Sequence, residues 1–310
     1  MITKPIDVLE FFPIRKNKKQ KQAFRNGVQS YAEELGYQVK IEKGSVGAQN
    51  LVIGNPDTAN YLVTAHYDTP AQMPIPNFIT PCNFWAFLAY QLIVTVLMLA
   101  LASIPGFVAV ALGMNPQNAS YVWLLSLYVI LGFMMFGPGN KNNANDNTSG
   151  VVTVLEIATS LPEELRSKVC FVLFDLEEAG LIGSASYAKA HKAQVKNQVV
   201  LNCDCVGDGD ELMMFPTKKA KKDTELMSAL QSICSSECAK SLVLRVRGFT
   251  YYPSDQRNFP KGVGIAAFRC QEKIGLYCDK IHTNKDLILD ENNVSFLRDK
   301  LITLIGTAAE

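Results

Sequence analysis

A long stretch without any charged residue divides this chain of 310 residues. The uncharged stretch runs from Thr69 to Asn140. It follows directly on His66-Tyr67-Asp68 and precedes Asn145-Asp146-Asn147 by only a few residues. Two polar motifs are thus separated in sequence by a segment that does not resemble the rest of a water-soluble domain.

The middle of the uncharged stretch predicts a pair of apolar helices. Phe84 to Ile104 would be about 31 Å long as a helix, which matches a hydrocarbon core of ~30 Å. Pro105-Gly106 is expected to kink or end this helix. Gly113 to Asn118 has the composition of a polar turn, and Ala119 to Phe136 would add a second helix of about 27 Å. We therefore expect a helical hairpin at 84–137, inserted into a single domain built from 1–83 and 138–310.

The predicted hairpin fits a lipid bilayer, which it would cross twice with both ends on one side. Trp85 and Trp123 lie toward the segment ends, as interface aromatics do. The lysines of the N-terminal segment and Lys141 lie on the side of the remaining domain, so the positive-inside rule predicts a membrane-associated protein with its catalytic domain in the cytoplasm. The alternatives are a lid or a dimerisation arm on a soluble cytoplasmic protein.

Composition adds limits rather than a function. Thirty basic residues stand against 29 acidic ones, so no overall charge attracts nucleic acid, and none is expected as a partner. Eight cysteines show no paired zinc-ribbon spacing. The N-terminal segment is polar and rich in lysine rather than apolar, so we expect reduced thiols in a cytosolic setting. An oligomer stays possible.

Outside the hairpin, strand and helix patterns alternate, which predicts an α/β domain. Three continuous apolar runs have the length of strands buried on both faces. They are Tyr61 to Ala65, Val169 to Phe174 and Val199 to Cys203, with helical patterns at Gly150 to Ser160, Gly183 to His191 and Thr224 to Ser235. Ile265 to Phe268 is a further candidate strand and Glu291 to Ile305 a closing helix. The expected fold is a mixed, largely parallel central sheet flanked by helices.

Histidine and carboxylate side chains follow the predicted strands, where ligands of such sheets gather. The candidate metal ligands are His66, Asp146, Glu178, Asp204 and His282. Imidazole with carboxylate suits zinc, and the mixed set suits a pair of divalent ions. Asp68 is placed to hold the other nitrogen of His66. Glu177 is free to take a proton from an attacking water.

Taken in order, these motifs resemble the dinuclear zinc aminopeptidase family, metallopeptidase family twenty-eight. Its members include bacterial leucyl-type aminopeptidases and glutaminyl cyclases. The matching stretches are Ala65 to Asp68, Ala144 to Gly150, Asp175 to Ser184, Asn202 to Asp204, Ile281 to Thr283 and, near the substrate pocket, Ser254 to Phe259. The resemblance covers nearly the whole chain except the hairpin and implies a zinc exopeptidase fold.

The resemblance implies a role for each matching residue. His66 and Asp204 would hold one Zn²⁺, Glu178 and His282 would hold the other, and Asp146 would bridge them. Glu177 would be the general base and Asp68 would orient His66. A cis peptide bond is expected between Asp146 and Asn147.

The chain also departs from the family pattern. Gln256 stands where a histidine is expected near the pocket, and Ile281 stands where some members have a tyrosine that contacts the oxyanion. Tyr251 or Tyr252 could replace that tyrosine, or could only line a cleft. The third histidine, His191, is expected on the surface.

The sequence thus predicts a membrane-tethered, zinc-dependent aminopeptidase that hydrolyses N-terminal residues of peptides. Because the hairpin emerges close to the metal site, a preference for apolar N-termini is expected. A glutaminyl cyclase, a carboxypeptidase or a deacylase on the same fold is the near alternative. A non-catalytic membrane scaffold is the alternative from another class, and the complete ligand set with Glu177 argues against it.

Overall fold

The computed structural model describes residues 2–237 and 240–307, and in this part of the chain ten strands form one mixed sheet. The strand order is β1-β2-β4-β3-β5-β9-β6-β8-β7, and β10 pairs with β9. In chain order the strands are β1 (Val39–Lys43), β2 (Gln49–Ile53), β3 (Tyr61–His66), β4 (Val169–Phe174), β5 (Val199–Cys203), β6 (Glu211–Pro216), β7 (Ser235–Glu237), β8 (Lys240–Leu244), β9 (Lys261–Gln271) and β10 (Gly275–Tyr277). The four neighbours β4, β3, β5 and β9 run parallel. The predicted fold class is confirmed.

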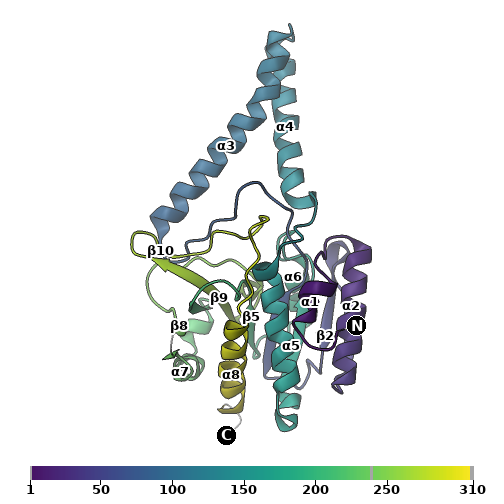
Figure 1. The fold of residues 1–310 in the computed structure, drawn as a ribbon, viewed down its shortest axis with the longest axis vertical. Coiled ribbons are helices and arrows are strands. Elements are labelled where there is room, and N and C mark those ends of the chain that lie inside the picture. Colours follow the sequence, from purple (N-terminus) through teal and green to yellow (C-terminus); the bar gives the residue numbers. More distant parts are fainter. Residues whose placement is uncertain (1, 238–239, 308–310) are drawn as a thin grey trace.

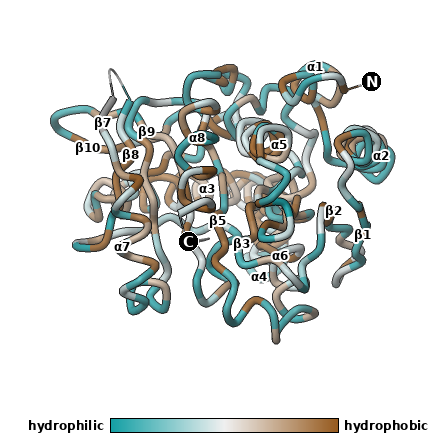
Figure 2. Tube along the Cα trace, turned by 90° about the horizontal axis from the view of Figure 1, so that it is seen from below, coloured by the Kyte–Doolittle hydropathy of each residue, from teal (hydrophilic) through white to brown (hydrophobic). Residues whose placement is uncertain are grey.

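Helices cover both faces of the sheet (Figure 1). They are α1 (Asp7–Phe11), α2 (Lys18–Glu34), α5 (Gly150–Ser160), α6 (Ile182–Ala190), α7 (Thr224–Ser232) and α8 (Glu291–Thr307), with the apolar α3 (Phe84–Ala111) and α4 (Pro116–Phe136) standing apart. Helix α2 begins where Asn17 and Gln20 form a reciprocal cap. In Figure 2, α2 at the rim of the domain is largely hydrophilic, whereas hydrophobic colour gathers near the centre.

The central strands bury both of their faces, which explains their continuous apolar sequences. In β3, Val63 packs with α5 and α8 in one core cluster, whereas Leu62 packs with Tyr187 of α6 in another. Since successive side chains of a strand point to opposite faces, the period-two alternation assigns the two clusters to the two sides of the sheet. Helices α5 and α8 lie side by side on one of them.

Two edge features differ from the sequence expectations. Strands β6 and β8 were not predicted, and the helix expected to reach Ser235 ends at Ser232, where the chain turns into β7. Strand β6 runs antiparallel to β9 and extends the sheet beyond the parallel centre. The difference matters little for the site, because the ligands follow the central strands.

Helices α3 and α4 form a hairpin that rises from the domain (Figure 1). Of the two outcomes expected at Pro105, a kink or an end, the end is wrong, because α3 continues through this proline to Ala111. Helix α4 begins at Pro116, where Asn115 accepts a hydrogen bond from the Asn118 amide, so it is longer than expected. Both helices are long and apolar enough to cross a membrane.

Candidate metal centre

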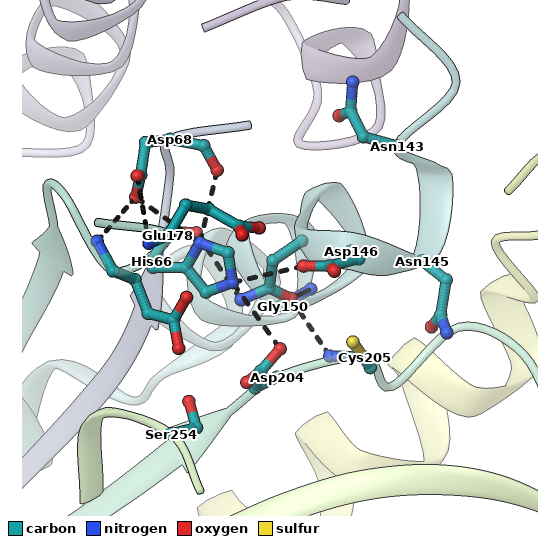
Figure 3. A network of polar contacts seen from close by, with 12 residues as sticks. His66, Asp68, Asn143, Asn145, Asp146, Gly150, Glu178, Asp204, Cys205 and Ser254 are labelled. Carbon is teal, nitrogen blue, oxygen red and sulfur yellow. Dashed lines mark hydrogen bonds and ion pairs between the residues drawn. The ribbon is translucent and has the colours of Figure 1, made fainter. Parts of the chain in front are cut away.

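The candidate ligands come from different parts of the chain and meet at the carboxyl ends of the central strands. Figure 3 shows four of them together, His66, Asp146, Glu178 and Asp204. His66 is the last residue of β3, and Asp204 directly follows β5. The remaining members come from the loop after β4, the helical turn before α5 and the segment after β10; they are Glu177, Glu178, Asp146 and His282. The sheet thus joins the two polar motifs that the hairpin separates in sequence.

Two ligand groups share one carboxylate. His66 Nε2 lies 3.3 Å from Asp146 Oδ1 and 3.6 Å from Asp204 Oδ1. On the other side, His282 Nε2 lies 3.2 Å from Asp146 Oδ2 and 3.5 Å from Glu178 Oε2. Each group offers two carboxylates and one imidazole, and the two oxygens of Asp146 face different groups.

The donor set fits divalent cations. Glu178 Oε1 and Asp204 Oδ1 are buried and accept no hydrogen bond from any residue that the structure describes. Burial raises the pKa of Glu178 to about 8, because an ionised carboxylate is costly away from water. Burial alone would lower the pKa of His282, but the charges of Glu178 and Asp146 outweigh it and raise the pKa to about 9. Buried carboxylates beside imidazole nitrogens are the environment that metal ions stabilise.

Asp68 contacts both His66 and the glutamate loop. The imidazole Nδ1 of His66 lies 3.2 Å from the backbone oxygen of Asp68 and 3.5 Å from its carboxylate. The carboxylate also accepts the backbone N–H groups of Glu177 at 3.0 Å and of Glu178 at 3.3 Å. Asp68 therefore positions a candidate ligand of each group, which goes beyond the role expected for it.

The carboxylate of Asp286 stabilises the turn that carries Asp146. This residue was not singled out from the sequence. The two carboxylate oxygens of Asp286 accept the backbone N–H groups of Asn145 and Asp146 at 2.8 and 3.0 Å. Burial raises the pKa of Asp286 to about 7. The peptide bond between Asp146 and Asn147 is cis, as predicted. The one available signal for Asp286 was an acidic residue four positions after His282.

Arg15 is the second functional residue that sequence reasoning missed. Its guanidinium is completely buried and lies between the two polar motifs. It donates to the backbone oxygen of Tyr67 at 2.5 Å, and to Asn143 Oδ1 and Thr148 Oγ1 at 3.0 Å each. It therefore ties the strand end of His66 to the turn of Asp146. Nothing in the local sequence distinguishes Arg15 from the basic residues that follow it.

A cavity of about 270 Å³ opens over the two groups. Its lining includes the candidate ligands, Glu177, Asn77, Ile79, Tyr252 and Ile281. Tyr252 donates its hydroxyl to the backbone oxygen of Asp204 at 2.9 Å, whereas Tyr251 is exposed and does not line the cavity.

Gln256, which replaces the expected histidine, is buried and donates to the backbone oxygen of Tyr252 at 2.8 Å. Its neighbour Asp255 is fully buried, and within the described part of the chain neither of its carboxylate oxygens has a hydrogen-bond partner. Burial raises the pKa of Asp255 to about 7.

His191 lies away from these groups, half-buried, with Nε2 2.8 Å from Glu42.

A larger cavity of about 550 Å³ lies beside β10 and contains none of the candidate ligands. The Asp208 carboxylate at this cavity is neutralised by Arg269 at 2.6 Å and by Lys280 at 3.4 Å. The buried Asp208 carboxylate is thus fully paired, and the larger cavity lacks the imidazole groups of the smaller one.

Comparison with known families decides the relationship. The model of peptidase family M28 matches residues 127–298, which is more than half of the chain. This chain belongs to peptidase family M28. The match spans Asp146, Glu177, Glu178, Asp204 and His282 and begins after the first polar motif. The predicted resemblance is confirmed, and with it a peptidase-fold hydrolase.

Solved structures of this fold agree with the assignment to M28. Glutaminyl cyclase from Porphyromonas gingivalis superposes with a TM-score of 0.63 at 16% identity, covering 99% of this chain and 96% of that one. The LapA aminopeptidase from Legionella pneumophila gives 0.56 at 15% identity, covering 97% and 66%. A glutaminyl cyclase from Bacteroides thetaiotaomicron gives 0.58 at 14%, covering 97% and 94%. At such identities the likeness shows the fold alone. Comparison with curated protein sequences gave no match.

Proposed function

We propose that this M28 protein is a membrane-tethered aminopeptidase that uses two divalent cations, Zn²⁺ first among them. The observation that carries the proposal is the pair of ligand groups joined by Asp146, with Glu177 at the wall of the same cavity. One imidazole and one carboxylate on each side of a shared carboxylate suit a two-metal hydrolytic site.

His66 and Asp204 would hold one cation, Glu178 and His282 the other, and Asp146 both. Bound there, the cations would lower the pKa of water and polarise the scissile carbonyl group. The chain's own residues supply positioning and proton transfer. Asp68 fixes the backbone of Glu177, so the Glu177 carboxylate is held beside the cavity to take a proton from water and pass it to the leaving amine.

The first experiment measures metal content and hydrolysis of an aminoacyl amide by purified full-length protein, beside Glu177→Ala. We expect about two zinc ions per chain, retained in the variant, with activity lost by at least about 10²-fold because general-base catalysis typically contributes 10²–10⁴. The exposed Glu163 gives the matched control, Glu163→Ala, which should keep full activity. A protein that binds no metal would contradict the proposal.

A glutaminyl cyclase is the second candidate, because the cyclase from Porphyromonas gingivalis aligns over nearly the full length of both chains. Peptides with N-terminal glutamine separate the two functions. A cyclase releases ammonia and converts the N-terminal glutamine into a ring. The peptide keeps its number of residues, and no amino acid is freed. An aminopeptidase releases the first residue and leaves a shortened peptide.

Membrane tethering is proposed from the hairpin. In the most apolar 18 residues of each helix, only 11% of α3 and 6% of α4 are buried within the protein. A core helix would be mostly buried. The segment also lies far from the N-terminus, unlike a signal sequence. The lysines of the N-terminal segment and Lys141 lie on the domain side of the hairpin, which supports a cytoplasmic catalytic domain by the positive-inside rule.

Replacing Asn83 to Pro138 by a short loop tests the tether. Full-length protein should float with lipid vesicles, and the shortened protein should stay in the soluble fraction while it still hydrolyses an aminoacyl amide. Retained hydrolysis serves as the control for folding. Equal flotation of the two proteins would rule out the tether and favour a lid or a dimerisation arm.

A further inference from the structure

The two hairpin helices pack against each other only in the half farthest from the domain. Ala102 and Gly106 of α3 and Ala119 of α4 are buried there. A Cβ atom added to Gly106 would lie 3.3 Å from the Ala119 carbonyl oxygen and 3.4 Å from the Cβ of Trp123. Small residues thus let the helices approach closely at this end.

The same helix faces are open near the domain. Eleven residues are about three helical turns, so Gln91 lies on the face of Ala102, and Thr95 on that of Gly106. Met134 likewise continues the face of Trp123. Gln91 and Thr95 are exposed, and Met134 is 38% exposed, against 5% for Ala119. The helices have therefore parted, as Figure 1 shows. We call the space between residues 84–97 of α3 and residues 128–136 of α4 the wedge.

The near end of α3 is fixed to one part of the domain. Phe84 packs edge-on against Phe249 with ring centroids 5.2 Å apart, and Phe87 lies 5.0 Å from Tyr251. Asn83 donates to the backbone oxygen of Ile274 at 3.0 Å, next to β10. This end of the hairpin is therefore anchored beside β10.

The end of α4 is anchored elsewhere. Its following residue, Pro138, accepts the backbone N–H of Gln72 at 2.8 Å, and Asn140 donates its backbone N–H to Pro70 at 2.9 Å. The two ends of the hairpin thus attach to different segments of the domain.

The chain that leads into α3 also walls the catalytic cavity. Met73 donates its backbone N–H to His282 at 2.7 Å, and Asn77 donates to Ile281 at 3.2 Å. Asn77 and Ile79 line the cavity. The segment that leads into α3 is therefore hydrogen-bonded to the segment of the candidate ligand His282. The same segment forms the base of the hairpin and part of the cavity wall.

Gln91 is the polar side chain of α3 whose amide makes no hydrogen bond within the helix, whereas the Thr95 and Ser103 hydroxyls donate to carbonyl oxygens one turn back. Gln91 sits within the first half of α3, where its neighbours Leu92 and Ile93 are apolar and exposed. A polar residue in a membrane segment normally faces protein or a water-filled cavity rather than lipid. Its position facing α4 suits a ligand with backbone amides, since a glutamine amide both donates and accepts.

We propose that the wedge admits the substrate and holds the apolar segment that follows the cleaved residue. The substrate class is then a peptide with a free amino terminus at the membrane surface and an apolar chain partitioned into the bilayer. The proposal rests on the aminopeptidase function and the membrane tether proposed above. Partitioning concentrates such a peptide at the cavity, and Gln91 would bond its backbone where water is scarce.

Two peptides with the same first two residues test the proposal on full-length enzyme in lipid vesicles. One is a short polar peptide, and the other continues into an apolar segment that partitions into the vesicles. For Gln91→Leu we expect KM of the apolar peptide to rise roughly 3- to 10-fold, the effect of one lost hydrogen bond, with the short peptide unchanged. Gln117→Leu, at the exposed far end of the hairpin, is the matched control and should change neither value.

A second pair of variants probes the wedge itself. Met134→Trp fills it from the α4 side and should raise KM of the apolar peptide alone. Leu125→Trp places the same ring at a position that is 64% exposed and should have no effect. Equal changes for both peptides, or none in any variant, would overturn the proposal and leave lipid as the occupant. If neither peptide is hydrolysed, the proposed aminopeptidase function itself fails, and this inference falls with it.

Discussion

The catalytic domain and the hairpin treat polar groups in opposite ways. The domain buries charged side chains and gives them partners, as Lys21 and Asp175 show at 2.5 Å. The hairpin carries no charged residue, and its serine and threonine hydroxyl groups bond the backbone of their own helix, as Thr95 does with the Gln91 carbonyl at 2.7 Å. Its large side chains are exposed instead, with Trp85 at 75% and Phe136 at 78%.

This contrast teaches what surroundings each region needs. Buried charges in the domain are stable only with partners, so the orphaned carboxylate oxygens of the site call for a cation. Exposed apolar surface on the hairpin is stable only away from water, so it calls for a bilayer or another apolar partner. The regions meet in the segment before α3, where the base of the hairpin is also a wall of the catalytic cavity.

The largest expected effect comes from removing the carboxylate shared by both ligand groups. Asp146→Ala should lose both cations and at least about 10³-fold in activity, because metal ions supply several kcal/mol of transition-state stabilisation. Asp204→Ala removes an oxygen from one group only and should keep about one cation. Metal content by mass spectrometry distinguishes the two variants. Two cations retained in Asp146→Ala would contradict the assigned ligand groups.

Much of this site was accessible from sequence because its ligands stand at the ends of strands buried on both faces. Such strands are continuous apolar runs, and β3, β4 and β5 were recognised by them. The polar residue after each run then marks the sheet edge where ligands gather. Local pattern and position in the fold coincide here.

Other features could not be predicted because tertiary contacts decide them. Strand β8 is short, lies near the edge of the sheet and has no distinctive alternation, so packing against β6 rather than propensity determines it. Asp286 and Arg15 act through backbone groups more than 50 residues away in sequence. Helix α3 passes through Pro105 because a proline in such an apolar helix can be accommodated, which local rules do not capture.

Arg15 gives the next largest effect and tests whether the domain depends on paired buried charge. Arg15→Met leaves several acceptors unpaired, among them the Tyr67 carbonyl, at roughly 1–3 kcal/mol each. Asn143 and Thr148 keep their mutual bond of 2.7 Å, so we expect a total loss of about 3–5 kcal/mol. Thermal unfolding in mild detergent should show it as a midpoint lowered by about 10 °C. The exposed Arg247 provides the control, Arg247→Met, with a change below about 1 °C. A stable Arg15→Met would mean that this buried cation is dispensable.

The smallest expected effects come from removing one helix cap in each region. Asp223 caps α7 in the domain by accepting the Leu226 amide, and it pairs with Lys261 at 2.7 Å. The Lys261 pair and the Leu226 amide lower the pKa of Asp223. Because the folded pKa lies below the unfolded one, the carboxylate stabilises the fold above the unfolded pKa, near 4, and that contribution is lost as pH falls through the folded pKa. Asp223→Ala should therefore cost about 1 kcal/mol at pH 7 and less at pH 3.

Asn115 supplies the counterpart in the hairpin, where a neutral side chain caps α4 through the Asn118 amide at 2.8 Å. Asn115→Ala should cost no more than about 1 kcal/mol, and its effect should not change with pH, since an amide does not titrate. The measurement is the free energy of unfolding of each variant and of the unmodified chain at both pH values. Chelator is present throughout, so that acid release of metal does not contribute to the difference. Equal pH dependence in the two variants would show that charge at Asp223 adds nothing to the cap. A cost that falls with pH at Asp223, beside a cost at Asn115 that does not, would show that an ionised group caps α7 whereas a neutral one caps α4.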